Sequence, residues 1–352
     1  MKVLSVVGNR PQFVKAAPTS VALRERGIEE VVLHTGQHYD PGLSHVFFEE
    51  LELAEPRYRL DLRTPDTEAM RIAVAGPLQE ERPDWVLVYG DTNSTLAGAL
   101  AAADADLPLA HVEAGLRSGD LSMPEERNRI EVDRRARLLL CPDERSRDQL
   151  SAERVRGRAE VVGDVMQDAT RLFAPIAQRR VHARALADLG DEPYAVLTLH
   201  REANTEPDRL RRLVAALGAA GWAFVFPVHP RTRKALADGA IELPPSLRAI
   251  EPVGYLEMLA LVSGAARVVT DSGGLQKEAY WLGVPCVTLR QSTEWVDTVL
   301  AGANTLVDPD APQGLPEILE NAQFPTDGPA LYGDGRAAAR IAEALYTLTP
   351  IS

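Results

Sequence analysis

Strand-length apolar runs that alternate with helix-length stretches constrain this chain more than any other feature. Residues 85–91 read WVLVYGD and residues 108–113 read PLAHVE, so two apolar runs each end at an acid. The alanine-rich stretch at 92–107 separates them and has the length and composition of a helix. A strand, a helix and a second strand in this order predict a βαβ unit with parallel strands. The carboxyl ends of such strands line the crevice in which α/β sheets bind their ligands.

The alternation continues on both sides of this segment and predicts an α/β protein with two doubly wound, Rossmann-like domains facing a central cleft. Further apolar runs of strand length lie at residues 1–8, 29–36, 135–144, 159–164, 194–200, 222–230, 247–253, 266–274 and 284–290. The predicted organisation is an N-terminal domain at 1–165, a linker at 166–192, a second domain at 193–332, and a helix at 333–352 that packs back on the N-terminal domain.

The charge balance limits the kinds of partner that the protein is expected to bind. The chain has 38 basic and 51 acidic residues and a formal net charge of -13, which argues against a nucleic-acid or anionic-membrane surface. No apolar run approaches the roughly 20 residues of a membrane span, and the start, MKVLSVVGNRPQF, lacks the pattern of a secretory signal. We therefore expect a cytoplasmic protein. Cys141 and Cys286 lie in apolar strand-like runs and are predicted to be buried thiols.

Three acids are expected to converge on one pocket at the strand ends of the first domain. Asp91 and Glu113 each end a strand, and Glu125 follows Pro124, which favours the first position of a helix. Two of them have simpler alternatives. Asp91 could cap the helix that follows it, and Glu125 could be a first-turn acid paired with Arg129 four residues on. Glu113 is harder to explain in this way, because glycines follow it and no helix begins there.

Two strand–turn–helix segments are candidate anion sites. In the first, Arg10 and Lys15 lie at the turn and in the first turns of the predicted helix, where free N–H groups favour an anion. In the second, Ser272, Gly273 and Gly274 form a tight turn that lets backbone amides approach a diphosphate closely. The alternatives are solvated cations in the first segment and an ordinary turn in the second.

Other polar residues of the second half are placed to face a ligand. Glu278 could accept hydrogen bonds from two hydroxyls, as a carboxylate does with a ribose diol, or it could be a surface acid. His200 and Arg201 follow a strand, and His200 could donate to a leaving diphosphate or be a satisfied buried histidine. His229 follows the next strand in the same way and is a weaker candidate.

No metal is expected. Gly36 breaks any helical spacing between His34 and His38, and His45 lies further along the same segment. The sequence contains no P-loop, no GxSxG elbow and no cysteine pattern for zinc. The predicted chemistry therefore relies on carboxylates, arginines and a histidine that act on a diphosphate-linked substrate.

These residues give the chain a clear resemblance to the non-hydrolysing UDP-N-acetylglucosamine 2-epimerases, which have a two-domain fold of the glycosyltransferase-B type. The resemblance covers nearly the whole chain and rests on VVGNRPQFVKAAP, VYGDTNSTLAGALAA, HVEAGLRSGD with MPEERNR, TLHRE, PVHPR, TDSGGLQKEA and LYGDG. It implies interconversion of UDP-N-acetylglucosamine and UDP-N-acetylmannosamine by anti elimination of UDP to a 2-acetamidoglucal and re-addition. It implies a UDP-sugar as ligand and no nicotinamide cofactor. We also expect a homodimer that serves cell-surface polysaccharide biosynthesis.

The resemblance also implies roles for single residues. Asp91, Glu113 and Glu125 match the proposed acid/base groups. The residues that match those holding UDP are Arg10, His200, Ser272, Gly273, Gly274 and Glu278. We count His200 as a catalytic candidate as well, because it could stabilise the leaving diphosphate. The further candidates for substrate binding are Lys15, Arg117, Arg129, Arg201, His229 and Arg290.

The chain departs from the family in two segments. Trp295 stands in TEWVD where many members have the arginine of TERPE, so a phosphate contact is lost or comes from another residue such as Arg290. QHYDPGL, from Gln37, replaces the family's QHREML and does not support allosteric control by UDP-N-acetylglucosamine.

Alternative functions remain open at this stage. HTGQHYD, GDTNST, SMPEERNR and GDVM also resemble the sister enzymes that epimerise UDP-2,3-diacetamido-2,3-dideoxyglucuronate. A glycosyltransferase of the same fold is the alternative of another class, although it usually needs a single catalytic base. A nucleotide-sugar sensor is a third, and it would need no acids crowded at one place.

Overall fold

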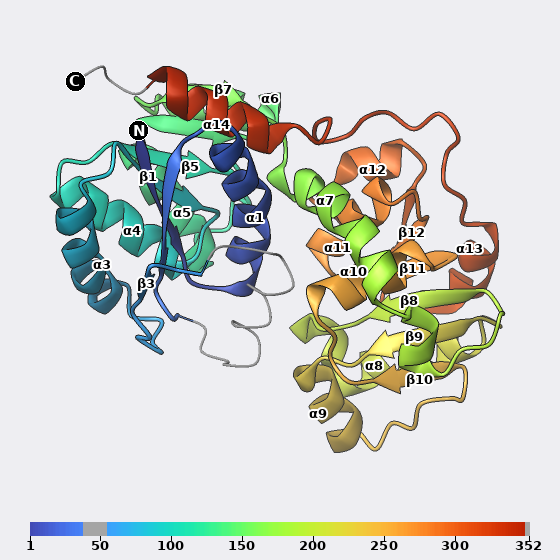
Figure 1. Ribbon diagram of the computed structural model, residues 1–352. Helices are drawn as coiled ribbons and strands as arrows, with labels where there is room; N and C mark the ends of the chain where they lie inside the picture. Colours follow the sequence, from blue (N-terminus) through green and yellow to red (C-terminus); the bar gives the residue numbers. More distant parts are fainter. Residues whose placement is uncertain (38–54, 349–352) are drawn as a thin grey trace. The chain divides into compact units, whose positions relative to one another are not determined.

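The computed structural model describes residues 1–37 and 55–348, except for the side chain of Arg10. The chain divides into two compact units, which we call unit 1 (Met1–Arg171 with Tyr332–Ser352) and unit 2 (Leu172–Leu331). Each unit is built on one parallel sheet whose successive strands are joined through helices (Figure 1). The predicted α/β fold class, with two doubly wound sheets, is therefore confirmed.

The sheet of unit 1 has seven strands in the order β3-β2-β1-β4-β5-β6-β7. Its strands are β1 (Lys2–Val7), β2 (Glu29–His34), β3 (Tyr58–Arg59), β4 (Trp85–Tyr89), β5 (Leu109–Val112), β6 (Leu138–Cys141) and β7 (Arg158–Val161). Every residue of β4, β5 and β6 is buried. Helices cover both faces of a parallel sheet, which is why these strands appear in the sequence as continuous apolar runs rather than as alternating ones.

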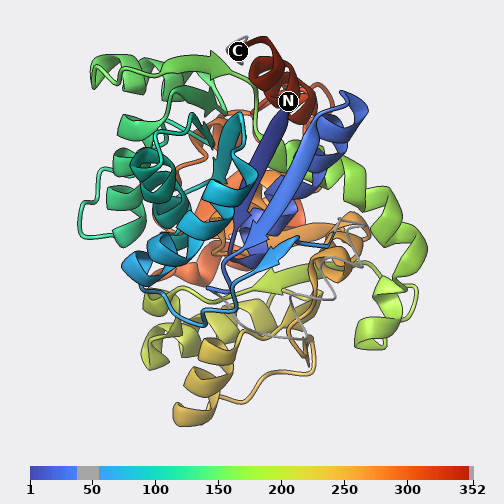
Figure 2. The same cartoon turned by 60° about the vertical axis from the view of Figure 1, so that its left-hand side comes forward.

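The helices that pack with unit 1 include one from the end of the chain. They are α1 (Arg10–Glu25), α3 (Thr67–Glu81), α4 (Asn93–Asp104), α5 (Pro124–Arg135), α6 (Glu144–Ala152), α7 (Val165–Arg180), which continues into unit 2, and α14 (Ala337–Leu348). Helices α1 and α14 lie side by side on one face of the sheet, and α3 and α4 pack together on the other (Figure 1, Figure 2). The indole of Trp85 donates to the Leu345 carbonyl at 3.2 Å and ties α14 to the sheet.

The sheet of unit 2 has six strands in the order β10-β9-β8-β11-β12-β13. Its strands are β8 (Tyr194–Thr198), β9 (Ala223–Pro227), β10 (Leu247–Ile250), β11 (Arg267–Thr270), β12 (Cys286–Leu289) and β13 (Asn304–Val307). Its helices are η1 (Ala183–Ala187), η2 (Glu202–Thr205), α8 (Pro207–Gly218), α9 (Pro230–Asp238), α10 (Tyr255–Ser263), α11 (Gly273–Trp281), α12 (Val296–Leu300), η3 (Pro312–Gly314) and α13 (Leu315–Asn321).

Two further findings concern burial. Cys141 and Cys286 are free, buried thiols, as predicted. Burial raises the pKa of each thiol to about 12, so neither is a reactive thiolate near neutral pH.

Among the described helices, none combines the length and the apolar composition needed to cross a bilayer.

Candidate active site

The central strands of unit 1 bring two of the predicted acids to one edge of the sheet. β4 lies between β1 and β5, and these strands are parallel. Asp91 follows β4 and Glu113 follows β5. The strand order reverses between β1 and β4, and open α/β sheets bind their ligands at such a switch point. The N-cap of α4 is Thr92, so the alternative that Asp91 caps this helix is wrong.

Glu113 has a strained backbone and a charged partner. Its φ of +73° lies in the left-handed region that residues other than glycine rarely adopt, and such conformations cluster at functional sites. The Lys15 ammonium contacts Glu113 Oε2, and both side chains are mostly buried. Burial lowers the pKa of Lys15, but the negative charges of Glu113 and Asp91 outweigh burial and raise that pKa. Lys15 therefore stays cationic beside the two carboxylates.

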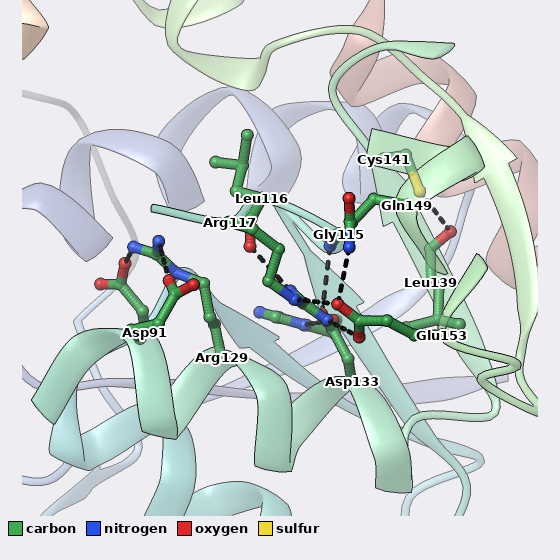
Figure 3. Close-up of polar contacts among 12 residues, drawn as sticks. Asp91, Gly115, Leu116, Arg117, Arg129, Asp133, Leu139, Cys141, Gln149 and Glu153 are labelled. Atoms are coloured by element: carbon green, nitrogen blue, oxygen red, sulfur yellow. Dashed lines mark hydrogen bonds and ion pairs between the residues drawn. The ribbon is translucent and has the colours of Figure 1, made fainter. Parts of the chain in front are cut away.

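Arg129 joins this cluster from α5. Its guanidinium contacts the Asp91 carboxylate (Figure 3). Its Nη1 donates to Glu126 Oε2 at 2.7 Å. Burial lowers the pKa of Arg129, but Asp91, Glu126 and Glu113 together raise it. We call Lys15, Asp91, Glu113 and Arg129 the unit 1 cluster. Its two cations pair with two partly buried carboxylates and offset the repulsion between them.

The adjacent acids at the start of α5 have different environments. Glu125 is exposed, and no hydrogen bond or ion pair links it to the unit 1 cluster within the described residues. Glu126 is 2% exposed and accepts hydrogen bonds at 3.0 Å from the backbone N–H groups of Ser118 and Gly119. Glu126, which the sequence did not single out, therefore holds the loop before α5 in place.

Arg10 and Arg117 are two further candidates of unit 1. Arg10 is the first residue of α1, and its side chain lies outside the described part of the structure. Arg117 donates to Asp133 Oδ2 at 2.7 Å and to both carboxylate oxygens of Glu153 at 2.8 and 2.7 Å (Figure 3). The guanidinium of Arg117 is therefore bound within the protein.

In unit 2, a buried aspartate that the sequence analysis missed organises the loop after β8. Asp271 follows β11, which neighbours β8 at the switch point of this sheet. Its carboxylate accepts hydrogen bonds from the backbone N–H groups of His200 (3.0 Å) and Arg201 (2.9 Å) and from Asn204 Nδ2 (3.1 Å). It also lies 3.0 Å from His200 Nδ1. Asp271 therefore orients the imidazole of His200, as a carboxylate does for a catalytic histidine.

His229 and Arg231 lie beside this loop. The rings of His200 and His229 have centroids 5.8 Å apart. Arg231 Nη1 donates to the His200 carbonyl at 3.2 Å, and Arg201 Nε donates to the Asp271 carbonyl at 2.9 Å. Burial, His200 and Arg231 all lower the pKa of His229, which favours the neutral ring.

Helix α11 begins at the predicted diphosphate turn. Ser272 is its N-cap, but the serine side chain makes no capping bond among the described residues. A Cβ added at Gly274 would meet no atom within 4 Å, whereas one at Gly273 would lie 2.5 Å from Glu294 Oε1. A carboxylate therefore already lies at the start of α11, where amide N–H groups attract anions. Glu278 lies in the second turn of the same helix and is half-buried.

Trp295, which replaces the arginine of similar enzymes, and Arg290 both have charged partners. Lys277 Nζ lies 4.0 Å from the centre of the Trp295 ring, within cation–π range. Arg290 Nη2 pairs with Glu294 Oε2 at 2.9 Å. Burial raises the pKa of Glu294, but Arg290 and Arg201 outweigh burial and lower it, so this carboxylate is ionised.

Metal ligation finds no support in the described side chains. Within residues 1–37 and 55–348, no group of three or more His, Cys, Asp or Glu side chains is arranged to hold a metal ion. His34 is buried, and burial lowers its pKa to about 4. His38 and His45 lie outside the described residues.

The environment of Asp271 predicts a pH-dependent stability. Burial raises the pKa of Asp271, but His200 and the backbone N–H groups outweigh burial and lower that pKa below its ordinary value of 3.8. A lowered pKa stabilises the folded state above pH 3.8, and this contribution is lost as the pH falls through the folded-state pKa. Asp271→Asn should reduce the free energy of unfolding near neutral pH by about 1–3 kcal/mol and weaken its dependence on acid.

Urea unfolding between neutral and acidic pH measures this effect. Asp208→Asn is the control, because Asp208 is an exposed acid of α8 in the same unit. An unchanged acid dependence in Asp271→Asn would show that this carboxylate is not ionised in the folded protein.

The chain is similar to known proteins over nearly its whole length. The family model described as UDP-N-acetylglucosamine 2-epimerase matches residues 21–346. The UDP-2,3-diacetamido-2,3-dideoxy-D-glucuronate 2-epimerase of Pseudomonas aeruginosa is 43% identical, over 99% of this chain and 100% of that protein. The UDP-N-acetylglucosamine 2-epimerase of Methanocaldococcus jannaschii is 38% identical, over 98% of this chain and 99% of that protein. Its crystal structure with UDP-GlcNAc and UDP has a TM-score of 0.85 and 37% identity, over 99% of this chain and 100% of that one.

Proposed function

Because this chain belongs to the UDP-N-acetylglucosamine 2-epimerase family, we propose that it is an isomerase that interconverts UDP-N-acetylglucosamine and UDP-N-acetylmannosamine. The reaction is anti elimination of UDP to a 2-acetamidoglucal, followed by re-addition of UDP. The observation that carries this proposal is the unit 1 cluster, in which Asp91 and Glu113 lie with two cations at the switch point of the sheet. A binding protein would have no need for acids crowded at one place.

We assign the first step, stabilisation of the leaving UDP, to unit 2. The C2 proton of the sugar is weakly acidic because no carbonyl adjoins it, so the C1–O bond must begin to break before this proton leaves. The leaving diphosphate then needs stabilisation by donors that are already in place. The start of α11 offers backbone N–H groups, and His200, whose Nδ1 pairs with Asp271, offers a second ring N–H when its imidazole carries both protons. We assign the binding of UDP to Ser272, Gly273, Gly274, Glu278, His200, Arg201, His229 and Arg290, with Arg10 from unit 1.

The second task, proton transfer at C2, falls to unit 1. A carboxylate can accept a proton, and that of Glu113 lies against the Lys15 ammonium. We assign Glu113 as the base and Asp91 and Glu125 as the other acid/base groups. Glu125 is exposed and makes no hydrogen bond or ion pair in the described structure, whereas Glu126 accepts hydrogen bonds from the loop before α5. Proton transfer by one positioned group contributes about 10²–10⁴ in rate.

The substrate has a second candidate. The relative from Pseudomonas aeruginosa, at 43% identity, is named for UDP-2,3-diacetamido-2,3-dideoxy-D-glucuronate, whereas that from Methanocaldococcus jannaschii, at 38%, is named for UDP-N-acetylglucosamine. Both substrates share the UDP group and the acetamido carbon at C2, so the residues assigned above serve either one. We also propose that the enzyme acts as a cytoplasmic homodimer in cell-surface polysaccharide biosynthesis.

Product analysis tests the function and the choice of sugar. Purified enzyme is incubated with each UDP-sugar in turn, without any acceptor, and the ¹H NMR spectrum is followed to equilibrium. We expect a mixture of C2 epimers from one substrate, and the same mixture when the reaction starts from the other epimer. Release of free sugar or no change with both substrates would show that the proposed function is wrong.

A further inference from the structure

A buried histidine of unit 1 connects the loops that carry the proposed acid/base groups. His111 lies within β5, and its side chain is fully buried, as is that of Asp133 on α5. His111 Nδ1 lies 2.7 Å from Asp133 Oδ1, and His111 Nε2 lies 2.7 Å from the Gly90 carbonyl oxygen. A carbonyl oxygen can only accept, so Nε2 must carry a proton and donate it to Gly90.

The other oxygen of Asp133 extends this network. Asp133 Oδ2 accepts hydrogen bonds from the Gly115 backbone N–H at 3.2 Å and from Arg117 Nη1 at 2.7 Å (Figure 3). Arg117 also donates to the Leu116 carbonyl at 2.7 Å and to Glu153. Burial opposes the ionisation of Asp133, but His111 and Arg117 outweigh burial and lower the pKa of this carboxyl. Buried charges in this network are therefore paired and hydrogen-bonded, as a stable core requires.

The atoms that this network holds lie next to the proposed acid/base groups. Gly90 precedes Asp91, and its φ of +65° turns the chain at the end of β4. Gly115 follows Glu113 by two residues, and both have φ in the left-handed region, +84° and +73°. A strained glutamate stays in place only when its surroundings hold it there. The network fixes the backbone near Glu113 through its hydrogen bonds to the Gly90 carbonyl and to the Gly115 N–H.

Helix α5 is the third element that the network fixes. It carries Asp133 and also Arg129, which contacts Asp91. Asp133 therefore joins α5 to the ends of β4 and β5 through His111 and to the loop after β5 through Gly115 and Arg117. A shift of α5 would move Arg129 and Glu125 relative to Glu113.

We propose that His111 is a positioning residue for epimerisation: its imidazole links the Gly90 carbonyl to Asp133 and so sets the positions of Asp91 and Glu113 relative to α5. Arg117 acts in the same network and is a positioning residue rather than a substrate ligand. This inference rests on the proposed function, because it assigns Asp91 and Glu113 to the reaction. Neither residue of the buried pair contacts the sugar in this account.

Two amide substitutions separate the two contacts of His111. The amide nitrogen of asparagine occupies about the position of Nδ1, so His111→Asn keeps a donor to Asp133 and loses the donor to Gly90. The amide nitrogen of glutamine reaches about as far as Nε2, so His111→Gln keeps the donor to Gly90 and loses the one to Asp133. Both variants remove the imidazole, and they therefore control for each other.

The expected results for activity and stability run in opposite directions. His111→Asn should lower kcat by about 100-fold, because a small displacement of reacting groups costs that much. It should bind UDP as the wild type does, because the proposed UDP ligands lie mainly in unit 2. His111→Gln should keep more activity but unfold at a lower temperature, since its buried Asp133 loses a donor. If activity instead follows stability across the two variants, or if His111→Asn keeps the wild-type kcat, the positioning role is wrong.

A measurement on the wild-type protein covers the case in which a variant does not fold. In a ¹H–¹⁵N spectrum of the ring nitrogens, His111 Nε2 should be protonated and slow to exchange, as a donor to a buried carbonyl must be. An unprotonated Nε2 would overturn the inference. A wild-type protein that epimerises neither UDP-sugar would instead refute the proposed function, and the spectrum would still test the contact.

Discussion

Glu113→Gln is expected to lower the rate of epimerisation by about 10²–10⁴-fold while UDP binds with unchanged affinity. The reason is that the Glu113 carboxylate, which contacts the Lys15 ammonium, is the proposed acceptor of the C2 proton. A neutral amide at this position cannot accept that proton. The UDP ligands proposed in unit 2 are untouched by the change. Steady-state kinetics and calorimetric titration with UDP measure the two effects on the same preparation.

Glu131→Gln is the matched control for this variant. Glu131 lies on α5 in the same unit and pairs with Arg135 at the surface, and its side chain is 39% exposed. The same change of charge there should leave both kcat and the affinity for UDP unaltered. Wild-type activity in Glu113→Gln would remove Glu113 from the mechanism, and an equal loss in Glu131→Gln would indicate an effect of net charge.

Gly274→Ala should weaken UDP binding by roughly 10–100-fold, because the added methyl group would occupy the space in which a charged diphosphate approaches the backbone N–H groups. A methyl group at Gly274 meets no protein atom within 4 Å, so the substitution fits the protein without UDP. It should even raise the free energy of unfolding by about 0.5–1 kcal/mol, since alanine favours a helix over glycine. Higher stability together with weaker binding would identify the space beside Gly274 as the place of the diphosphate.

Gly76→Ala provides the comparison. Gly76 lies within α3 of unit 1, is exposed, and a Cβ there also meets no atom within 4 Å. This variant should gain similar stability and bind UDP as the wild type does. Thermal unfolding and calorimetric titration with UDP report both quantities. If Gly274→Ala binds UDP with wild-type affinity, the diphosphate does not approach the start of α11.

The sequence predicted the positions of Asp91 and Glu113 because those positions depend on local information. Continuous apolar runs predict the buried parallel strands β4 and β5, and the residue after such a strand lies at the carboxyl edge of the sheet. The turn at Ser272 was predictable for the same reason, because β11 ends just before it and α11 begins with the next residue.

The choice between neighbouring side chains could not be predicted in this way. Glu125 and Glu126 are equivalent in the sequence, and only the rotation of α5 against the rest of unit 1 exposes one and buries the other. Arg117 was expected to bind substrate, yet in the structure it bonds to Asp133 and Glu153, which lie 16 and 36 residues away in sequence. Tertiary packing determines such pairings, so they cannot be predicted from the spacing of residues in the sequence.

The buried polar residues are marked in the sequence by their apolar surroundings. His111 stands in the apolar run LAHV, and Asp271 directly follows the apolar run of β11. A polar side chain in such a run must find a hydrogen-bonding partner when it is buried. The sequence therefore indicates that partners exist, and the structure identifies them as Gly90 and Asp133 for His111 and as the loop after β8 for Asp271.

Incorporation of deuterium at C2 tests most directly whether the acids of unit 1 act on a sugar whose diphosphate unit 2 binds. The enzyme is incubated in deuterated water with whichever UDP-sugar it converts and without an acceptor. Wild-type enzyme should place solvent deuterium at C2 of both epimers, and both Glu113→Gln and Gly274→Ala should slow this exchange. Formation of the second epimer with its original C2 proton retained would contradict proton transfer by these carboxylates.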